Sequence, residues 1–197
     1  MIEESTDLVP SDAQLLFVVD ERLLLRQLGP DDARALFRLV DAERERLRRT
    51  LPWVDGTRGV DDTIAFLRTS VEEAEDGEGW QLGIFADGEL CGVIGHHSLS
   101  WLHARVNLGY WLAASHEGRG LMTRAATALI DHAFSQLGMH RVEICAAIDN
   151  VRSRAVAERL GLVQEGVRRQ AEKIGERFVD LVVYGVLAHE WAARRAR

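Results

Sequence analysis

Residues 110–125, YWLAASHEGRGLMTRA, are the most informative segment of the sequence, because they have the pattern of a strand that passes through a glycine-bearing turn into a helix. Gly118 and Gly120 let backbone N–H groups approach a ligand closely, and the helix N-terminus adds partial positive charge. The turn can therefore hold a pyrophosphate, with Arg119 and Arg124 as further positive charges. A plainer interpretation is a strand-to-helix connection whose glycines only permit the turn.

A second strand-to-helix junction, DNVRSRAVAERLGL at 149–162, follows this helix and one more strand. Asn150 and Ser153 both suit the N-terminal cap of a helix, which would be a purely structural role. Two polar helix starts after successive strands face the same edge of a sheet. An extended, phosphate-rich cofactor can then lie across both.

Elsewhere in the chain, apolar residues at helical spacing predict helices from Pro30, from Asp61, through Ala126 to Leu137, and from Asn150 to Gly161. The alternating segments predict strands, and Asp87-Gly88 predicts a tight hairpin turn. The resulting order of elements predicts an α/β fold, with a mixed sheet and helices on both faces. The predicted strands lie in LLFVVDERLLLRQL, WQLGIFA, ELCGVIGHHSL, ARVNLGYWL, HRVEICAAI, LVQEGVRR and RFVDLVVYGVL.

Size and composition predict one globular domain over 15–197, preceded by a polar leader at 1–14 that we expect to be disordered. The formal charge of −7 argues against a nucleic-acid partner and favours a cationic substrate. No apolar run approaches the ~18 residues of a membrane span, and no signal peptide is visible. With Cys91 and Cys145 as its only cysteines, the chain is expected in the cytoplasm with reduced thiols.

Several segments, in order along the chain, resemble the GNAT acetyltransferase superfamily, and more narrowly the bacterial ribosomal-protein N-terminal acetyltransferases of the RimJ and RimL type. The resemblance runs from about Leu23 to Trp191. It implies a central, mostly antiparallel sheet with helices on both faces, and self-association into a homodimer. The matching segments are LLLRQL, LPW, LCGVIG, LGYWL, HEGRGLMT, RVEICAAIDNVRSRAVAERLGLVQEGVRRQAE and DLVVYGVLAHEW.

The resemblance also implies acetyl-CoA as the cofactor, without a metal. The glycine turn would bind the pyrophosphate, and the strand before it would pair with the pantetheine arm. Asn150 would also contact CoA, and the Ser153 hydroxyl would lie near the sulfur of CoA. Glu117 departs from the family pattern, since its charge would lie beside phosphates unless it points away. The implied cofactor residues are Trp111, Leu112, Ala113, Gly118, Arg119, Gly120, Leu121, Met122, Thr123, Asn150 and Ser153.

By the same resemblance, Glu172 in QAE is the general base and Ser153 protonates the leaving thiolate, in direct transfer through a tetrahedral intermediate. Glu165 remains a competing candidate for the base. Without a catalytic role, Glu172 would be an ordinary exposed carboxylate and Ser153 a helix cap. Trp53, in the LPW segment, would border the acceptor. The adjacent His96 and His97 point to opposite faces of a strand and do not suit one metal.

The predicted function is acetylation of a protein or peptide N-terminus, such as that of a ribosomal protein. Two alternatives stay open: acylation of a small amine, such as a polyamine, an amino acid derivative or an antibiotic, and a catalytically silent acyl-CoA-binding protein. The donor, acetyl or a longer acyl group, also stays open.

Overall fold

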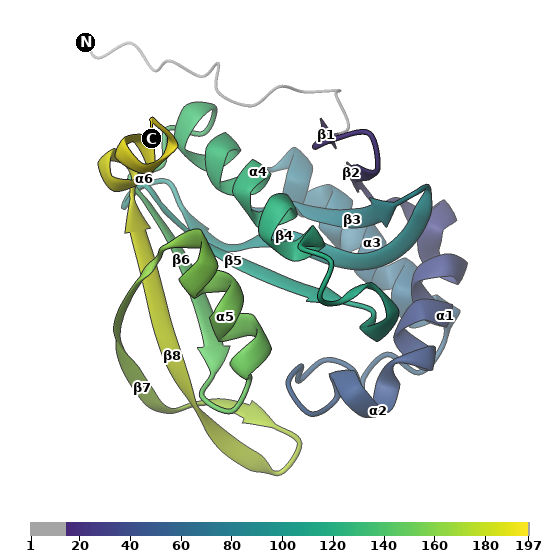
Figure 1. The fold of residues 1–197 in the computed structure, drawn as a ribbon. Coiled ribbons are helices and arrows are strands. Elements are labelled where there is room, and N and C mark those ends of the chain that lie inside the picture. Colours follow the sequence, from purple (N-terminus) through teal and green to yellow (C-terminus); the bar gives the residue numbers. More distant parts are fainter. Residues whose placement is uncertain (1–14, 197) are drawn as a thin grey trace, which may run out of the picture.

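Eight strands form one sheet in the order β1-β2-β3-β4-β5-β6-β8-β7, in a computed structural model that describes residues 15–196 (Figure 1). Neighbouring strands are antiparallel except β5 and β6, which are parallel. The predicted mixed, mostly antiparallel sheet is confirmed, whereas the leader at 1–14 lies outside the described residues. The strands are β1 Leu16–Val18, β2 Leu23–Gln27, β3 Gln81–Ala86, β4 Glu89–Ser100, β5 Arg105–Leu112, β6 Arg141–Ala147, β7 Val163–Ile174 and β8 Arg177–Leu187.

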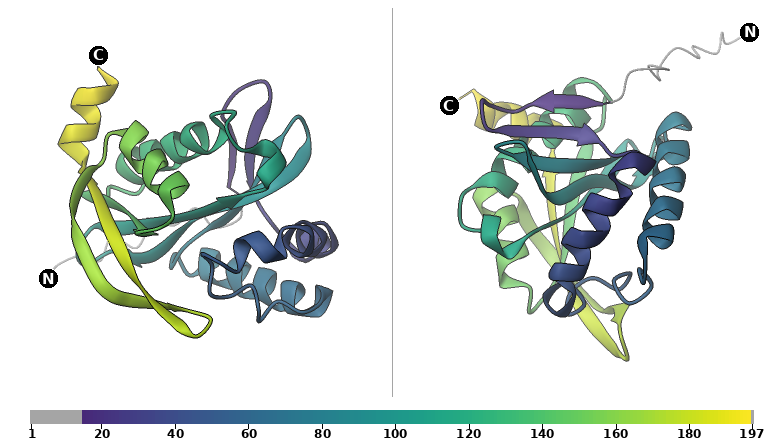
Figure 2. Two further views of the ribbon diagram at one scale, coloured as in Figure 1. Left: turned by 60° about the horizontal axis from the view of Figure 1, so that its bottom comes forward. Right: turned by 90° about the vertical axis from the view of Figure 1, so that its right-hand side faces the viewer.

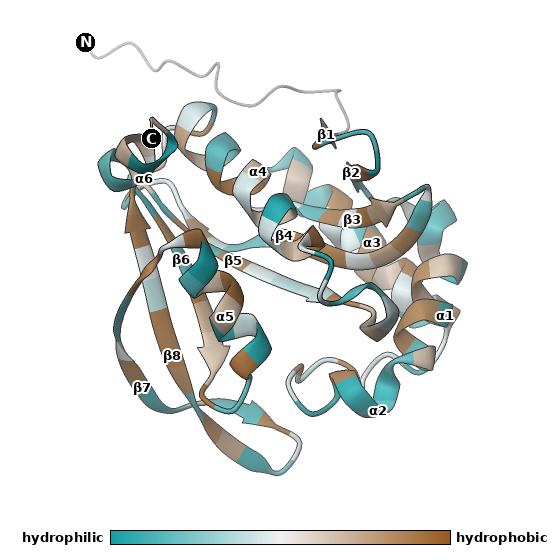
Figure 3. Cartoon of the chain, viewed as in Figure 1, coloured by the Kyte–Doolittle hydropathy of each residue, from teal (hydrophilic) through white to brown (hydrophobic). Residues whose placement is uncertain are grey.

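Helices cover both faces of the sheet (Figure 2). On one face α1 and α3 pack a core of apolar side chains that includes Leu36, Leu67 and Val93. On the other face α4 and α5 contribute Leu129 and Val156 to the larger core. The buried residues of α1, α3, α4 and α5 are mostly apolar. Figure 3 shows that apolar and polar residues alternate along these helices. The helices are α1 Ala33–Ala42, α2 Arg44–Leu47, α3 Val60–Glu75, α4 Leu121–Ser135, α5 Val151–Leu160 and α6 Ala188–Arg195, with 3-10 turns at Pro30–Asp32 and Ala114–His116.

The parallel pair β5 and β6 diverges soon after it starts. Only Arg105–Asn107 of β5 pair with Arg141–Glu143 of β6, although both strands continue beyond these residues. The divergence opens a gap inside the sheet, and Figure 1 shows α5 and the start of α4 near it. This gap is the feature of the fold that positions the site.

Three elements differ from the sequence-based prediction. The single helix predicted from Pro30 is divided at Glu43 into α1 and the short α2. Strand β7 continues through QAEKI to Ile174 rather than stopping near residue 169, and α6 was not predicted. Nearly all of β7 is exposed, so it lacks the alternation of polar and apolar residues that marks a half-buried strand. In α6 only Trp191 is buried. Within residues 15–196, no helix combines the length and apolarity needed to cross a membrane.

Candidate active site

A cleft of about 1490 Å³ opens where α4 and α5 begin. Gly118 and Gly120 both have φ near 73°, the left-handed conformation that glycine adopts without strain. No side chain caps α4, so the N–H groups of its first turn remain available to an anion. Nine of the eleven residues predicted to bind the cofactor line this cleft, namely Trp111, Leu112, Gly118, Gly120, Leu121, Met122, Thr123, Asn150 and Ser153.

The other two predicted residues, Ala113 and Arg119, do not line the cleft. The Ala113 N–H donates to the carbonyl of Cys91 on β4 at 2.7 Å. The Arg119 guanidinium lies 3.4 Å from the Asp87 carboxylate, beside a separate small cavity of about 110 Å³. The turn therefore presents its backbone to the cleft, while the Arg119 side chain contacts the β3–β4 hairpin.

The free edge of β5 borders the cleft. Backbone groups of successive residues alternate between the two sides of a strand, so Ala113 facing β4 implies that Tyr110 and Leu112 face the gap. The Leu112 carbonyl accepts a hydrogen bond from Arg46 Nη2 of α2 at 2.5 Å. Where β6 has diverged, an extended ligand can pair with the remaining groups of this edge.

The Glu117 carboxylate is neutralised by two arginines. Arg46 Nη1 lies 2.9 Å from one of its oxygens, and Arg152 of α5 binds the other. Arg46 also contacts Glu43, whose second oxygen accepts the N–H of Ala114 at 3.1 Å. The negative charge that departs from the family pattern thus joins α2 and α5 across the cleft instead of facing phosphates unpaired.

Asn150, Ser153 and Tyr110 form a local hydrogen-bond cluster at the start of α5. The Asn150 carboxamide oxygen accepts the Ser153 N–H at 3.2 Å, which is the cap geometry expected from the sequence. The Ser153 hydroxyl donates to the Tyr110 hydroxyl, and Tyr110 in turn donates to the Ser153 carbonyl, each at 3.2 Å. Burial raises the pKa of Tyr110 to about 12, so the phenol stays protonated at neutral pH.

The two candidate bases have opposite surroundings. Glu172 is half-buried on β7, and no other group within residues 15–196 forms a hydrogen bond or ion pair with its carboxylate. Burial raises the pKa of Glu172. Glu165 accepts two hydrogen bonds from Arg141, one of them at 2.7 Å, and this arginine lowers the pKa of Glu165. Glu172 is therefore the better proton acceptor of the two.

The candidate acid and base lie on opposite faces of the sheet. Tyr110, which contacts Ser153, packs against the core beneath α4 and α5. Glu172 shares one side of β7 with Ile174, which packs on Ala147. In β6, Val142 and Ile144 face α4 and α5. Side chains alternate along a strand, so Ala147 points to the opposite face. Ile174 lines the cleft, whereas Glu172 itself does not.

Trp53 lies on the same face as Glu172. Its ring centroid is 6.3 Å from that of Trp111, which packs against the core of α1 and α3 and also lines the cleft. Trp53 is 41% exposed and does not line the cleft, so an aromatic surface is available just outside it.

Sequence reasoning missed Tyr110, Arg46 and Arg152 as members of the site. Tyr110 lies in the quoted YWL segment, and its side chain faces the core opposite Trp111, as alternation along a strand requires. Nothing distinguishes Arg46 from its neighbours in RERLRR. Its contact with Glu117 spans 71 residues and exists only in the folded chain.

Comparison with known proteins identifies the family of this chain. The model of the acetyltransferase (GNAT) domain matches residues 22–163. The chain belongs to the GNAT acetyltransferase family. A putative ribosomal N-acetyltransferase, YdaF of Bacillus subtilis (strain 168), is 35% identical over 181 residues, covering 90% of this chain and 97% of the relative. The ribosomal-protein-serine acetyltransferase of Escherichia coli (strain K12) is 31% identical over 167 residues, covering 84% and 93%.

Solved GNAT structures have the same architecture. RimL, a ribosomal L7/L12 alpha-N-protein acetyltransferase in complex with coenzyme A, superimposes with a TM-score of 0.85 at 26% identity, covering 88% of this chain and 98% of RimL. The predicted family and N-acetyltransferase class are confirmed. Open backbone N–H groups beside arginines suit the phosphates of acetyl-CoA in this GNAT domain.

Proposed function

We propose that the chain acetylates the N-terminal amine of a protein or peptide, using acetyl-CoA. The observation that carries the proposal is the placement of two proton-transfer groups on opposite faces of the sheet, with Ser153 on one face and the unpaired Glu172 on the other. The ribosomal-protein relatives support a protein acceptor.

Acetyl-CoA supplies an acetyl thioester, and residues of this chain remove a proton from the amine and donate one to the leaving sulfur. An α-amino group has a pKa of about 7.7 to 8.0, against about 10.4 for lysine, so a carboxylate suffices as base. Counted from the ammonium form, two protons leave the acceptor nitrogen as the C–N bond forms and the C–S bond breaks. The first passes to the base and on to solvent. The second replaces, through water, the proton that the leaving sulfur receives from Ser153, so the products are the amide, the thiol of CoA and one released proton. Glu172 removes a proton on the acceptor face, directly or through water, and the sulfur receives a proton on the other face.

Ser153 is the donor to the leaving sulfur. Its hydroxyl proton points to the Tyr110 oxygen in this structure and turns toward the sulfur in this step, while the contact with Tyr110 holds the Ser153 oxygen in place. The Leu112 N–H, on the free edge of β5, would stabilise negative charge that develops on the acyl oxygen. Asn150 holds the first turn of α5, and through it Ser153, at the cleft. Trp53 and Trp111 offer an aromatic surface to the acceptor.

The test is a screen for thiol release from acetyl-CoA, with mass spectrometry to locate the acetyl group. Peptides beginning with Ala, Ser or Met, polyamines and aminoglycosides are offered separately. We expect turnover with peptides and acetylation confined to the α-amine. Turnover only with small amines would contradict the proposal, and so would acetyl-CoA binding without turnover of any acceptor.

A further inference from the structure

The cleft carries a charge opposite to that of the whole chain. The formal net charge of the chain is −7, yet among residues 15–196 six arginines and only two carboxylates, Glu117 and Asp149, line the cleft. Glu117 is already paired with two of these arginines. The acidic composition therefore does not predict the charge that a substrate meets.

Two of the arginines lie beside the turn that suits the phosphates. Arg152 and Arg159 both belong to α5, and Arg159 Nε lies 3.3 Å from the hydroxyl of Thr123 in the first turn of α4. These side chains can serve the negative charges of the cofactor. They leave the arginines at the far end of the cleft without a role in the proposed function.

At that end, the loop after α2 meets the β7–β8 hairpin. Figure 1 shows α2 and the hairpin tip on the side of α5 away from the start of α4. Arg177, the first residue of β8, donates to the Arg49 carbonyl at 2.8 Å and lies 3.1 Å from Asp149. This contact holds the backbone of Arg49 beside Arg177, whose own charge is paired with Asp149, and both arginines line the cleft.

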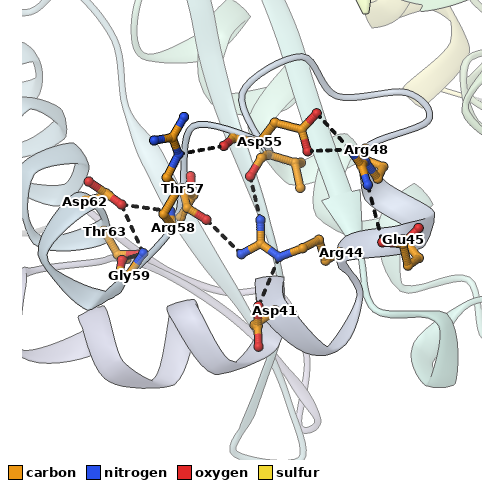
Figure 4. A network of polar contacts seen from close by, with 11 residues as sticks. Asp41, Arg44, Glu45, Arg48, Asp55, Thr57, Arg58, Gly59, Asp62 and Thr63 are labelled. Atoms are coloured by element: carbon orange, nitrogen blue, oxygen red, sulfur yellow. Dashed lines mark hydrogen bonds and ion pairs between the residues drawn. The ribbon is translucent and has the colours of Figure 1, made fainter. Parts of the chain in front are cut away.

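Arg49 is the uncompensated charge of this region. Its neighbour Arg48 lies near Glu45 and Asp55, in the network that braces the loop (Figure 4). By contrast, no carboxylate within residues 15–196 lies within 4.0 Å of the exposed Arg49 guanidinium. A cleft-lining arginine without an internal partner is available to an anionic group of a ligand.

We infer that the acceptor carries a negatively charged group within a few residues of its reactive amine, and that Arg49, assisted by Arg177, binds it. The inference rests on the proposed function and narrows the substrate to N-termini followed by Asp or Glu. A polyamine brings only positive charge to a cleft with a surplus of arginines, so it is a poor acceptor here. The cationic substrate expected from the net charge is the opposite of what this cleft favours.

The experiment uses three peptides that share one N-terminal residue and carry two Asp, two Ala or two Lys at positions 3 and 4, with spermidine as a fourth acceptor. Each is assayed with the wild-type chain, with Arg49→Glu, and with Arg68→Glu. Arg68 is exposed on α3 outside the cleft, so its reversal changes the net charge equally without changing the cleft.

We expect wild-type kcat/KM to be about tenfold higher for the Asp peptide than for the Lys peptide, and this ratio to fall as salt is raised. Arg49→Glu should abolish or reverse the preference, whereas Arg68→Glu should keep it. Equal kcat/KM for all three peptides, or equal effects of the two reversals, would overturn the inference while leaving N-terminal acetylation intact. Spermidine as the best acceptor, or no acetylation of any peptide, would overturn the proposed function as well.

Discussion

At the scale of single residues, the surroundings of Glu172 and Glu165 give them different chemistry. Glu172→Gln keeps the size of the side chain but cannot accept a proton, so we expect kcat to fall by ~10² to 10⁴ with little change in acetyl-CoA affinity. Glu165→Gln removes a partner of Arg141 at the surface and should leave kcat within a few fold of wild type. Steady-state kinetics and calorimetry on both variants measure this contrast.

The pH dependence supplies the control for this prediction. Burial raises the pKa of Glu172, so the acid limb of wild-type kcat/KM should lie above the ordinary glutamate value of about 4.3. Raising the pH supplies neutral amine without a base, so Glu172→Gln should regain activity relative to wild type as the pH nears the acceptor pKa. If Glu165→Gln shows that rescue instead, the base assignment is wrong and the family assignment is unaffected.

The paired hydroxyls of Tyr110 and Ser153 belong to the same scale. If Tyr110 acts by orienting Ser153, Tyr110→Phe should lower kcat several-fold without raising KM for acetyl-CoA. In a chain that already carries Ser153→Ala, the same substitution should then have no further effect on kcat. Independent, multiplicative losses in the double variant would mean that Tyr110 acts separately from Ser153.

At the scale of elements, the turn into α4 combines an unusual backbone conformation with an open helix end. No atom within 4 Å blocks a Cβ at Gly120, so the effect of Gly120→Val comes from its φ of +73° and from its place at the cleft. We expect acetyl-CoA affinity to fall at least about tenfold, since backbone hydrogen bonds to phosphate would be lost.

Gly138→Val is the matched control for this turn. Gly138 has φ of +63° and an equally open surrounding, but it lies beyond the C-terminal end of α4 and outside the cleft. Both variants carry the left-handed penalty of ~1–2 kcal/mol in stability. Calorimetric titration with CoA should show loss of affinity only for Gly120→Val, and equal losses would remove the turn from the site.

At the scale of the whole molecule, stability should depend on pH through a buried histidine. His96 is 3% exposed, stacks on His132 and contacts the edge of Trp80, and neither ring nitrogen has a hydrogen-bond partner within residues 15–196. Burial lowers the pKa of His96 to about 3. Below the unfolded pKa of about 6.5 the unfolded chain binds a proton that the folded chain rejects, so the free energy of unfolding falls with pH.

His96 should lower the free energy of unfolding by up to ~1.4 kcal/mol for each unit by which the pH falls below 6.5. Urea unfolding of wild type and of His96→Leu between pH 6.5 and 4.5 isolates the contribution of His96, because the carboxylates titrate in both chains and their effect cancels in the difference. The difference between the two curves should grow as pH falls. His103→Gln, an exposed histidine on the turn after β4, should follow wild type. Parallel curves for wild type and His96→Leu would show that His96 titrates normally.

The features that depend on local backbone chemistry could be predicted from the amino-acid sequence. Helical periodicity and turn residues predicted the order of the elements up to β8 apart from the short α2, and the glycine turn at 118–123 and the Asn150 cap were located correctly. The extension of β7 and the helix α6 were missed, because exposed polar segments carry little periodic signal.

The contacts between segments that are distant in the sequence became visible in the folded chain alone. The parallel pairing of β5 and β6 stops after three residues, which opens the gap. The sequence of neither strand alone predicts where this pairing ends. The charge of Glu117 is balanced by arginines from α2 and α5, and the choice between Glu172 and Glu165 follows from burial and from Arg141. Ion pairing and pKa depend on distance and burial in space, which sequence neighbours do not fix.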